Sequence, residues 1–271
     1  MKILFTGHRG FLGRELIPLL KEDHEVFTFD GDYRNFESVQ GFVHENSVEK
    51  ILHAAVRGGR RNKLETHETL QNNVETTINI LRLDLPTILF CSGAIYNRDH
   101  SINRVTEVES LNSFPTDFYG QSKFISNALA RNHGNCSVLR FFNVFGPTEG
   151  FDRFISFNIS RYLAQEPMIV FNDFEMDFFF VRDTLPVISS WLREDPFPSE
   201  VNMVYEAKFL LSEICNFINT LGGYEVPIDI QEPSRNKNYS GGGAVLSSLG
   251  FNFLGLEKGI SQMYHHIKTN I

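Results

Sequence analysis

A tyrosine and a lysine four residues apart, Tyr119 and Lys123, have a spacing suited to proton transfer. A phenol with an ordinary pKa of about 10 exchanges protons poorly near neutrality unless a nearby ammonium lowers that pKa. If residues 119–132 form a helix, the two side chains lie one turn apart on the same face. Two unit charges ~5 Å apart at an effective dielectric of ~20 interact by roughly 3 kcal/mol, equivalent to about two pKa units. We therefore predict that Lys123 brings Tyr119 toward working pH.

A glycine-rich turn near the N-terminus predicts a dinucleotide site. Residues 2–6 form a short apolar strand, which leads into Gly7, Gly10 and Gly13 and a helical pattern over 11–21. Glycines there permit a tight turn, close approach of the backbone to a pyrophosphate and close helix packing. Together with Ser92, Tyr119 and Lys123 as catalytic residues, this pattern predicts a nicotinamide-dependent oxidoreductase. The expected cofactor contacts are Gly7, Arg9, Gly10, Phe11, Leu12, Gly13, Asp30, Ala54, Ala55, Tyr119 and Lys123.

Asp30 bears on which nicotinamide cofactor is used. It ends a predicted second strand over 25–29, where a carboxylate accepts hydrogen bonds from the adenosine ribose hydroxyls and repels the extra phosphate of NADP. This favours NAD. Arg9 in the glycine loop and Arg34 beyond the strand could instead pair with a phosphate, which leaves NADP as the alternative.

Composition limits the class of protein. The chain has 271 residues, 42% of them hydrophobic, and a net charge of -8, so it can bury a large core and lacks the broad basic face that nucleic acids and acidic membranes require. Its three cysteines fit no paired or metal-binding spacing and suggest reduced thiols. No apolar run approaches the ~18 residues of a membrane span. We expect a cytoplasmic protein with a small-molecule partner and no metal site.

Strand and helix patterns alternate through the first half of the chain. Strands are predicted over 50–55, 87–92 and 137–142, and helices over 64–83 and 119–132. This order predicts a Rossmann-type, doubly wound parallel sheet covered by helices on both faces, with ligands beyond the carboxyl ends of the strands.

After residue 147 the alternation weakens. A helix over 153–164, strands near 168–171 and 177–181, a helix from Asp183 and a last helix over 256–268 are predicted. We expect a dinucleotide-binding domain over 1–147 and a smaller α+β substrate lobe over 148–271, from which segments around 177–195 return to the first domain.

Several side chains have simpler structural interpretations. Phenylalanines 178–180 are predicted to pack in the core, and Asp183 to cap its own helix. His53 is expected to support a loop, and Cys91 to act as a small buried apolar residue. The run Ser240-Gly241-Gly242-Gly243 is predicted to be a flexible turn.

Motifs along nearly the whole chain resemble extended short-chain dehydrogenases/reductases, in the epimerase/dehydratase/reductase group that acts on nucleotide sugars. The loops at Gly7–Gly13 and Ala54–Gly59 are most similar to those of GDP-fucose synthase. The matching segments are 6–13, 53–55, 92–96, 119–123, 139–147 and 177–183.

The resemblance implies a role for each matching residue. Tyr119 would be the acid/base at a sugar oxygen, Lys123 would lower its pKa and bind the nicotinamide ribose, and Ser92 would hydrogen-bond the same sugar oxygen. Asn143 would contact the substrate diphosphate, and Arg153 is a further candidate for it. The resemblance also implies a homodimer, formed through the helices at 64–83 and 119–132.

Departures from the family pattern narrow the reaction. The acidic pair of sugar 4,6-dehydratases is replaced by Gly93 and Ala94, and the cysteine and histidine used for 3,5-epimerisation by Ala94 and Arg153. Simple hydride chemistry remains, either NAD(P)-dependent reduction of a nucleotide-linked 4-keto sugar or nucleotide-sugar 4-epimerisation. A non-catalytic dinucleotide-binding sensor is a further alternative, against which the three catalytic residues argue.

Two features weaken the substrate assignment. Met176 stands where many members carry a phosphate-binding arginine. Carboxylates near the expected pocket would repel a diphosphate, so we expect them to face solvent, namely Glu149, Asp152, Asp173 and Glu175.

Overall fold

A parallel six-stranded sheet forms the centre of the molecule. The computed structural model describes residues 1–59, 65–232 and 237–270. The strands lie in the spatial order β2-β1-β3-β4-β6-β10 and every neighbouring pair is parallel. The bounds are β1 Lys2–Thr6, β2 Glu25–Phe27, β3 Lys50–His53, β4 Thr87–Ser92, β6 Cys136–Phe141 and β10 Glu200–Met203.

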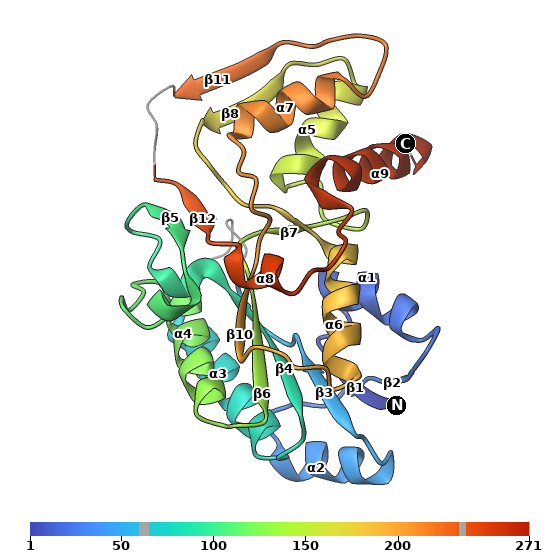
Figure 1. The fold of residues 1–271 in the computed structure, drawn as a ribbon, viewed down its shortest axis with the longest axis vertical. Helices are drawn as coiled ribbons and strands as arrows, with labels where there is room; N and C mark the ends of the chain where they lie inside the picture. The colour runs from blue at the N-terminus through green and yellow to red at the C-terminus, as the bar shows by residue number, and fades with distance from the viewer. Residues whose placement is uncertain (60–64, 233–236, 271) are drawn as a thin grey trace.

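Helices cover both faces of this sheet, as the doubly wound prediction required (Figure 1). Side chains alternate across a strand, so Ile3 and Phe5 of β1 join the core cluster that contains residues of α1 and α6, whereas Leu4 joins the cluster that contains residues of α2 and α3. The helices are α1 Phe11–Leu20, α2 Phe36–Glu45, α3 His67–Leu81, α4 Phe118–Arg131 and α6 Thr184–Leu192. Helices α3 and α4 lie side by side.

A second hydrophobic core lies beyond the carboxyl ends of the strands, at the top of Figure 1. Its centre is a group of fully buried side chains that includes Ile159, Met168 and Ile260. The surrounding elements are α5 Phe154–Leu163, β8 Met168–Asn172, α7 Leu211–Asn219, β11 Ile228–Glu232 and α9 Gly255–Asn270, with β8 and β11 paired in parallel.

Two short parallel pairs connect the sheet to the second core. Strand β7 (Val144–Phe145) pairs with β9 (Phe179–Phe180), and β5 (Ile102–Val105) pairs with β12 (Tyr239–Gly241). Short helical turns occupy η1 Gly93–Tyr96, η2 Glu107–Glu109, η3 Val181–Asp183 and α8 Ala244–Ser248. The second pair brings residues 239–241 beside the segment that follows η1.

Some local predictions differ from the structure. The second strand ends at Phe27 instead of residue 29, and only Phe179–Phe180 of the predicted strand 177–181 is extended. Leu64, the predicted start of the third helix, lies outside the described residues. Phenylalanines 178–180 are buried, as predicted. The predicted flexible turn at 240–243 is wrong at its first two residues, since Ser240 and Gly241 belong to β12.

Asp183 occupies the N-cap position of α6, as predicted, but its side chain does not cap that helix. Its carboxylate makes no capping bond in α6 and instead accepts hydrogen bonds from the backbone amides of Leu254 and Gly255, both at 2.9 Å, where α9 begins. No helix in the described part of the chain is long and apolar enough to cross a membrane.

Candidate active site

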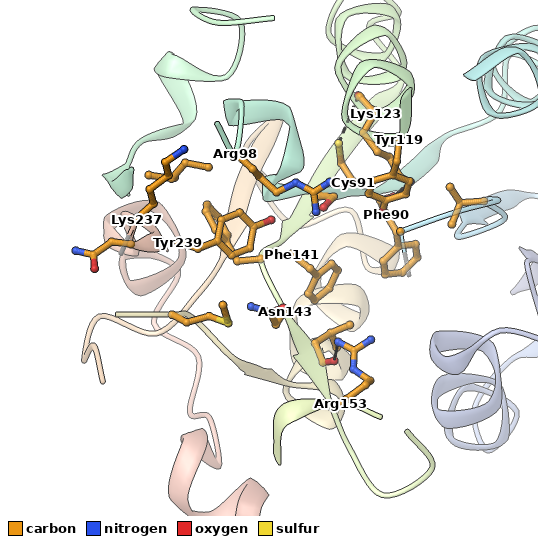
Figure 2. Close-up of a pocket in the computed structure, with 18 of the residues that line it drawn as sticks. Phe90, Cys91, Arg98, Tyr119, Lys123, Phe141, Asn143, Arg153, Lys237 and Tyr239 are labelled. Carbon is orange, nitrogen blue, oxygen red and sulfur yellow. Dashed lines mark hydrogen bonds between the residues drawn. The ribbon is translucent and has the colours of Figure 1, made fainter. Parts of the chain in front are cut away.

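A cavity of about 380 Å³ lies beyond the carboxyl ends of β4 and β6, between the sheet and the second core. It brings together all three predicted catalytic residues and both predicted diphosphate contacts (Figure 2). The predicted residues in its lining are Leu12, Ala54, Ser92, Tyr119, Lys123, Asn143 and Arg153.

Helix α4 positions Tyr119 and Lys123. The helix begins after Asp117, whose carboxylate accepts the amide of Gly120 at 2.7 Å. Lys123 is buried one turn after Tyr119, and its Nζ donates to the Phe90 carbonyl oxygen of β4 at 2.9 Å. The predicted one-turn spacing of the pair is present.

The electrostatic prediction for this pair is wrong for the structure as it stands. Burial raises the pKa of the Tyr119 phenol to about 12, and interaction with Ser92 is the largest opposing effect. The Lys123 Nζ lies 6.0 Å from the centroid of the Tyr119 ring and is bonded to a backbone carbonyl. Burial lowers the pKa of Lys123 as well. Desolvation therefore outweighs the attraction that the helical spacing predicted.

Ser92 is the last residue of β4, where the chain turns into η1. Its hydroxyl accepts the backbone amide of Ala94 at 3.2 Å. Hydrogen bonding with Ser92 lowers the pKa of two phenols, that of Tyr119 and that of Tyr239. Three hydroxyls thus meet at one end of the cavity.

The glycine loop is shaped for a dinucleotide. Gly7 has a φ of +75°, and a Cβ there would lie 2.7 Å from the backbone nitrogen of Ala55. A Cβ on Gly13 would lie 2.5 Å from the Cα of His8, so α1 packs directly on the loop. No side chain caps the first turn of α1, which begins after Gly10, so its amides are free to bind an anion. These features fit the phosphates of NAD or NADP.

Behind this loop, His53 acts as the predicted support. Its Nδ1 shares a hydrogen bond of 2.8 Å with the Thr6 hydroxyl, which in turn accepts the amide of Ala55 at 3.0 Å. Burial lowers the pKa of His53 to about 3, so its ring stays neutral. Cys91 is buried beside the site, as expected.

Asp30 lies at the surface beyond β2, paired with residues of the glycine loop. The Arg9 guanidinium lies 2.5 Å and the His8 Nε2 3.2 Å from the same carboxylate oxygen. Arg34 pairs with Asp32 at 2.6 Å. Both candidate arginines for an extra phosphate are therefore engaged by carboxylates.

Asn143 and Arg153 line the wall nearest the second core. The Asn143 amide donates to the Asp177 carbonyl oxygen at 2.9 Å. Arg153 donates to the Val144 carbonyl oxygen at 2.9 Å, and its Nε lies 3.2 Å from the carboxylate of Glu149.

The prediction that nearby carboxylates face solvent is wrong for two of them. Glu149 is buried against Arg153, and burial raises its pKa to about 7. Glu175 is mostly enclosed and accepts the Ser240 hydroxyl at 2.8 Å. Neither reaches the cavity. Within the described residues, its lining contains four cationic side chains and no carboxylate: Arg98, Lys123, Arg153 and Lys237. A cavity with such a lining in an acidic chain favours an anionic ligand.

Sequence reasoning missed two polar residues of the cavity, Arg98 and Tyr239. Arg98 lies just after η1, and its guanidinium is 3.0 Å from the Asp117 carboxylate. Tyr239 comes from β12, far from Ser92 in the sequence. No local motif marks either residue, and only the pairing of β5 with β12 could have indicated that residues 98 and 239 meet.

Solved structures share this fold. UDP-glucose 4-epimerase from Thermotoga maritima matches 100% of this chain and 99% of its own with a TM-score of 0.82 and 18% identity. A dTDP-glucose 4,6-dehydratase from Bacillus anthracis, solved with NAD, has the same TM-score and identity. Its match covers 100% of this chain and 97% of the dehydratase chain. These likenesses show the Rossmann-type fold.

Sequence relatives show the family. GDP-6-deoxy-D-talose 4-dehydrogenase from Aggregatibacter actinomycetemcomitans is 27% identical over 203 residues, 69% of each chain. ADP-L-glycero-D-manno-heptose-6-epimerase from Brachyspira hyodysenteriae is 30% identical over 235 residues, 72% of each chain. The sequence model of the NAD dependent epimerase/dehydratase family matches residues 3–203. This match covers more than half of the chain, which also has the glycine loop and holds Ser92, Tyr119 and Lys123 in one cavity. The chain therefore belongs to the NAD dependent epimerase/dehydratase family.

Proposed function

We propose that the protein is an NAD(P)-dependent reductase of a nucleotide-linked 4-keto sugar. The observation that carries this proposal is the convergence of Ser92, Tyr119 and Lys123 in one basic cavity. The similarity to a GDP-6-deoxy-D-talose 4-dehydrogenase, which is named for chemistry at carbon 4, supports the choice of reaction.

Each residue of the site would have a separate role in this reaction. The nicotinamide, when bound, supplies the hydride. Tyr119 donates its phenolic proton to the sugar carbonyl oxygen as negative charge builds there, and the Ser92 hydroxyl donates a hydrogen bond to the same oxygen. Lys123 would hold the nicotinamide ribose, and the amides at the start of α1 the pyrophosphate.

The nucleotide sugar would extend from this end of the cavity toward the second core. Asn143 and Arg153 would contact its diphosphate, in keeping with the basic lining. We propose that residues 1–147 mainly bind the cofactor and residues 148–271 mainly the substrate, with segments near 177–195 packed back on the sheet. NAD is the preferred cofactor in this proposal because Asp30 stands after β2, and NADP is the alternative.

Dehydration has little support in this cavity. Elimination of water needs an additional acid and base, but Gly93 and Ala94 follow Ser92, and no carboxylate is in the cavity lining that the structure describes. A 4-epimerase needs no such pair, and the match to a UDP-glucose 4-epimerase over the whole chain supports it as the second candidate. The two differ in net cofactor turnover.

A direct test follows the absorbance of NADH or NADPH while the protein meets two panels, nucleotide 4-keto sugars with reduced cofactor and nucleotide sugars that carry a hydroxyl at carbon 4 with oxidised cofactor, with product NMR in parallel. A reductase consumes one reduced cofactor per product. The Tyr119→Phe variant should lose at least 100-fold in kcat because its proton donor is gone. Tyr224→Phe, whose hydroxyl bonds a carbonyl in the second core, is the matched control and should keep full activity.

The outcomes separate the candidates. Oxidation of cofactor that Tyr119→Phe abolishes supports the reductase. Inversion at carbon 4 of a 4-hydroxy nucleotide sugar, with no net change in cofactor absorbance and no reduction of the 4-keto panel, rejects it in favour of the 4-epimerase. Cofactor binding without any product from either panel contradicts both and favours the sensor.

We also propose that α3 and α4, which pack side by side, form the face of a homodimer. Sedimentation at micromolar concentration should then give twice the mass of one chain. A single-chain mass would contradict this arrangement.

A further inference from the structure

Arg98 is held firmly at the catalytic end of the cavity. It follows η1, which Ser92 caps, and its guanidinium lies 3.0 Å from the Asp117 carboxylate. The same carboxylate caps α4, the helix that carries Tyr119. Figure 2 shows the guanidinium pointing toward Tyr119 and lying beside Tyr239. One cation is thus tied to the helix end that positions the phenol.

Tyr239 forms the opposite side of the space around this guanidinium. Its backbone is anchored in both directions, because its amide donates to the Glu175 carbonyl oxygen at 2.9 Å and its carbonyl accepts the Asp177 amide at 3.1 Å. Its ring packs on Phe142 with centroids 5.0 Å apart. This aromatic wall bounds the space around the guanidinium, while the Arg98 side chain keeps 42% of its surface exposed.

Lys123 is placed less favourably for acting on the phenol. Its ammonium is committed to the Phe90 carbonyl oxygen and lies 6.0 Å from the centre of the Tyr119 ring. Arg98 opposes the rise in the Tyr119 pKa, whereas Cys91 and Glu65 add to it. Among the residues that the structure describes, the titratable and charged groups that face Tyr119 are Glu65, Cys91, Arg98, Lys123 and Tyr239.

We propose that Arg98 is a further catalytic residue, which supplies the positive charge that stabilises the Tyr119 phenolate and the oxygen of the reacting sugar. This role deepens the proposed function and rests on it for the identity of the reaction. When Tyr119 gives its proton to the sugar oxygen, a phenolate remains. A fixed cation beside it lowers the energy of that charged product and of the transition state that leads to it.

The charge effect can be measured without any substrate. We would place 3,5-difluorotyrosine at position 119, because fluorine makes the phenol acidic enough to titrate while the protein stays folded. Fluorine NMR then reports its ionisation. Arg98→Met should lower the acid dissociation constant of this phenol about tenfold, because the variant removes a positive charge that favours the phenolate. Arg98→Lys keeps the charge and should restore most of the effect.

A matched control separates a local from a general effect of charge. Arg193 likewise pairs with a carboxylate, that of Asp195 at 2.9 Å, but lies at the end of α6. Arg193→Met should leave the titration unchanged. An unchanged acid constant in Arg98→Met, or an equal change in Arg193→Met, would overturn the role of Arg98. Thermal unfolding of each variant verifies that the fold is retained.

Kinetics provides the second readout once a substrate is known. Arg98→Met should lower kcat about tenfold at neutral pH. The pH at which the rate falls on the alkaline side should rise, because the Tyr119 phenol of the variant stays protonated to a higher pH. A lower kcat without movement of the pH profile would contradict the electrostatic role. Failure of the sugar panel would reject the proposed function, whereas the fluorotyrosine titration would still decide the role of Arg98.

Discussion

A single buried carboxylate shows how much desolvation outweighs pairing in this protein. Glu149 lies against Arg153, yet its side chain is only 1% exposed and its pKa rises to about 7. In the folded state it therefore binds a proton that the unfolded chain releases above its ordinary pKa of about 4.5. Stability from this group is present at low pH and is lost as pH rises from about 4.5 to about 7.

Glu149→Gln should remove the free-energy cost of burying a carboxylate at this position. The amide carries no charge to desolvate and can still accept the Ser156 amide that bonds Glu149 at 3.2 Å. We expect the variant to be more stable than the parent at pH 8, by at most about 3 kcal/mol, with a smaller gain at pH 5. Urea unfolding at the two pH values measures this difference.

The control is Glu166→Gln, since Glu166 pairs with Arg161 at 3.0 Å but is 55% exposed. It should change stability by less than about 0.5 kcal/mol at either pH. Equal gains for Glu149→Gln at pH 5 and pH 8 would show that the carboxyl is not protonated in the folded protein.

At the scale of elements, a loop after β3 packs directly on Tyr119. A Cβ on Gly59 would lie 2.9 Å from the Tyr119 Cζ and 3.2 Å from its hydroxyl oxygen. Glu65 joins this loop to α4, because its carboxylate accepts the amide of Gly59 at 2.6 Å and that of Tyr119 at 3.1 Å. The loop thus restrains the phenol from the side of β3.

Gly59→Ala should therefore impair catalysis. The new methyl group pushes the phenol from its position, and we expect kcat to fall at least tenfold while the protein stays folded. Gly134 provides the control, because its φ of +77° nearly equals the +78° of Gly59 but nothing lies within 4 Å of its Cβ position. Gly134→Ala should cost about 1 kcal/mol of stability and no activity. Similar kcat values for the two variants would contradict the packing argument.

At the scale of the whole molecule, Asp183 joins the two hydrophobic cores. It is 3% exposed at the end of η3, and its carboxylate binds the first amides of α9 and the Tyr205 hydroxyl. Phe179, from the sheet core, stacks on the same Tyr205 ring with centroids 4.8 Å apart. One carboxylate therefore fixes the docking of the last helix on the rest of the chain.

Asp183→Ala should destabilise the protein by about 2–4 kcal/mol, because three buried donors lose their acceptor. Hydrogen exchange should show faster opening of α9 than of β4. Asp195→Ala, which removes an exposed carboxylate bonded to Ser190 and Arg193, should cost less than about 1 kcal/mol. Equal protection of α9 in Asp183→Ala and the parent would contradict the role of this link.

Sequence patterns alone determined the parallel sheet, the glycine loop and the set of Ser92, Tyr119 and Lys123. These features depend on local rules, because strand and helix periodicity, glycine conformation and one-turn spacing act within a few residues. The same rules could not foresee that Lys123 would bond Phe90 or that burial would govern the Tyr119 pKa.

Only the tertiary structure decided which distant groups complete the site. The pairing of β5 with β12 placed Tyr239 beside Arg98, and the packing around α5 buried Glu149 next to Arg153. Such contacts depend on the register of remote strands and on how much water each side chain loses. Desolvation is a property of the assembled surroundings, so a residue's charge state and its partners follow from the packed molecule.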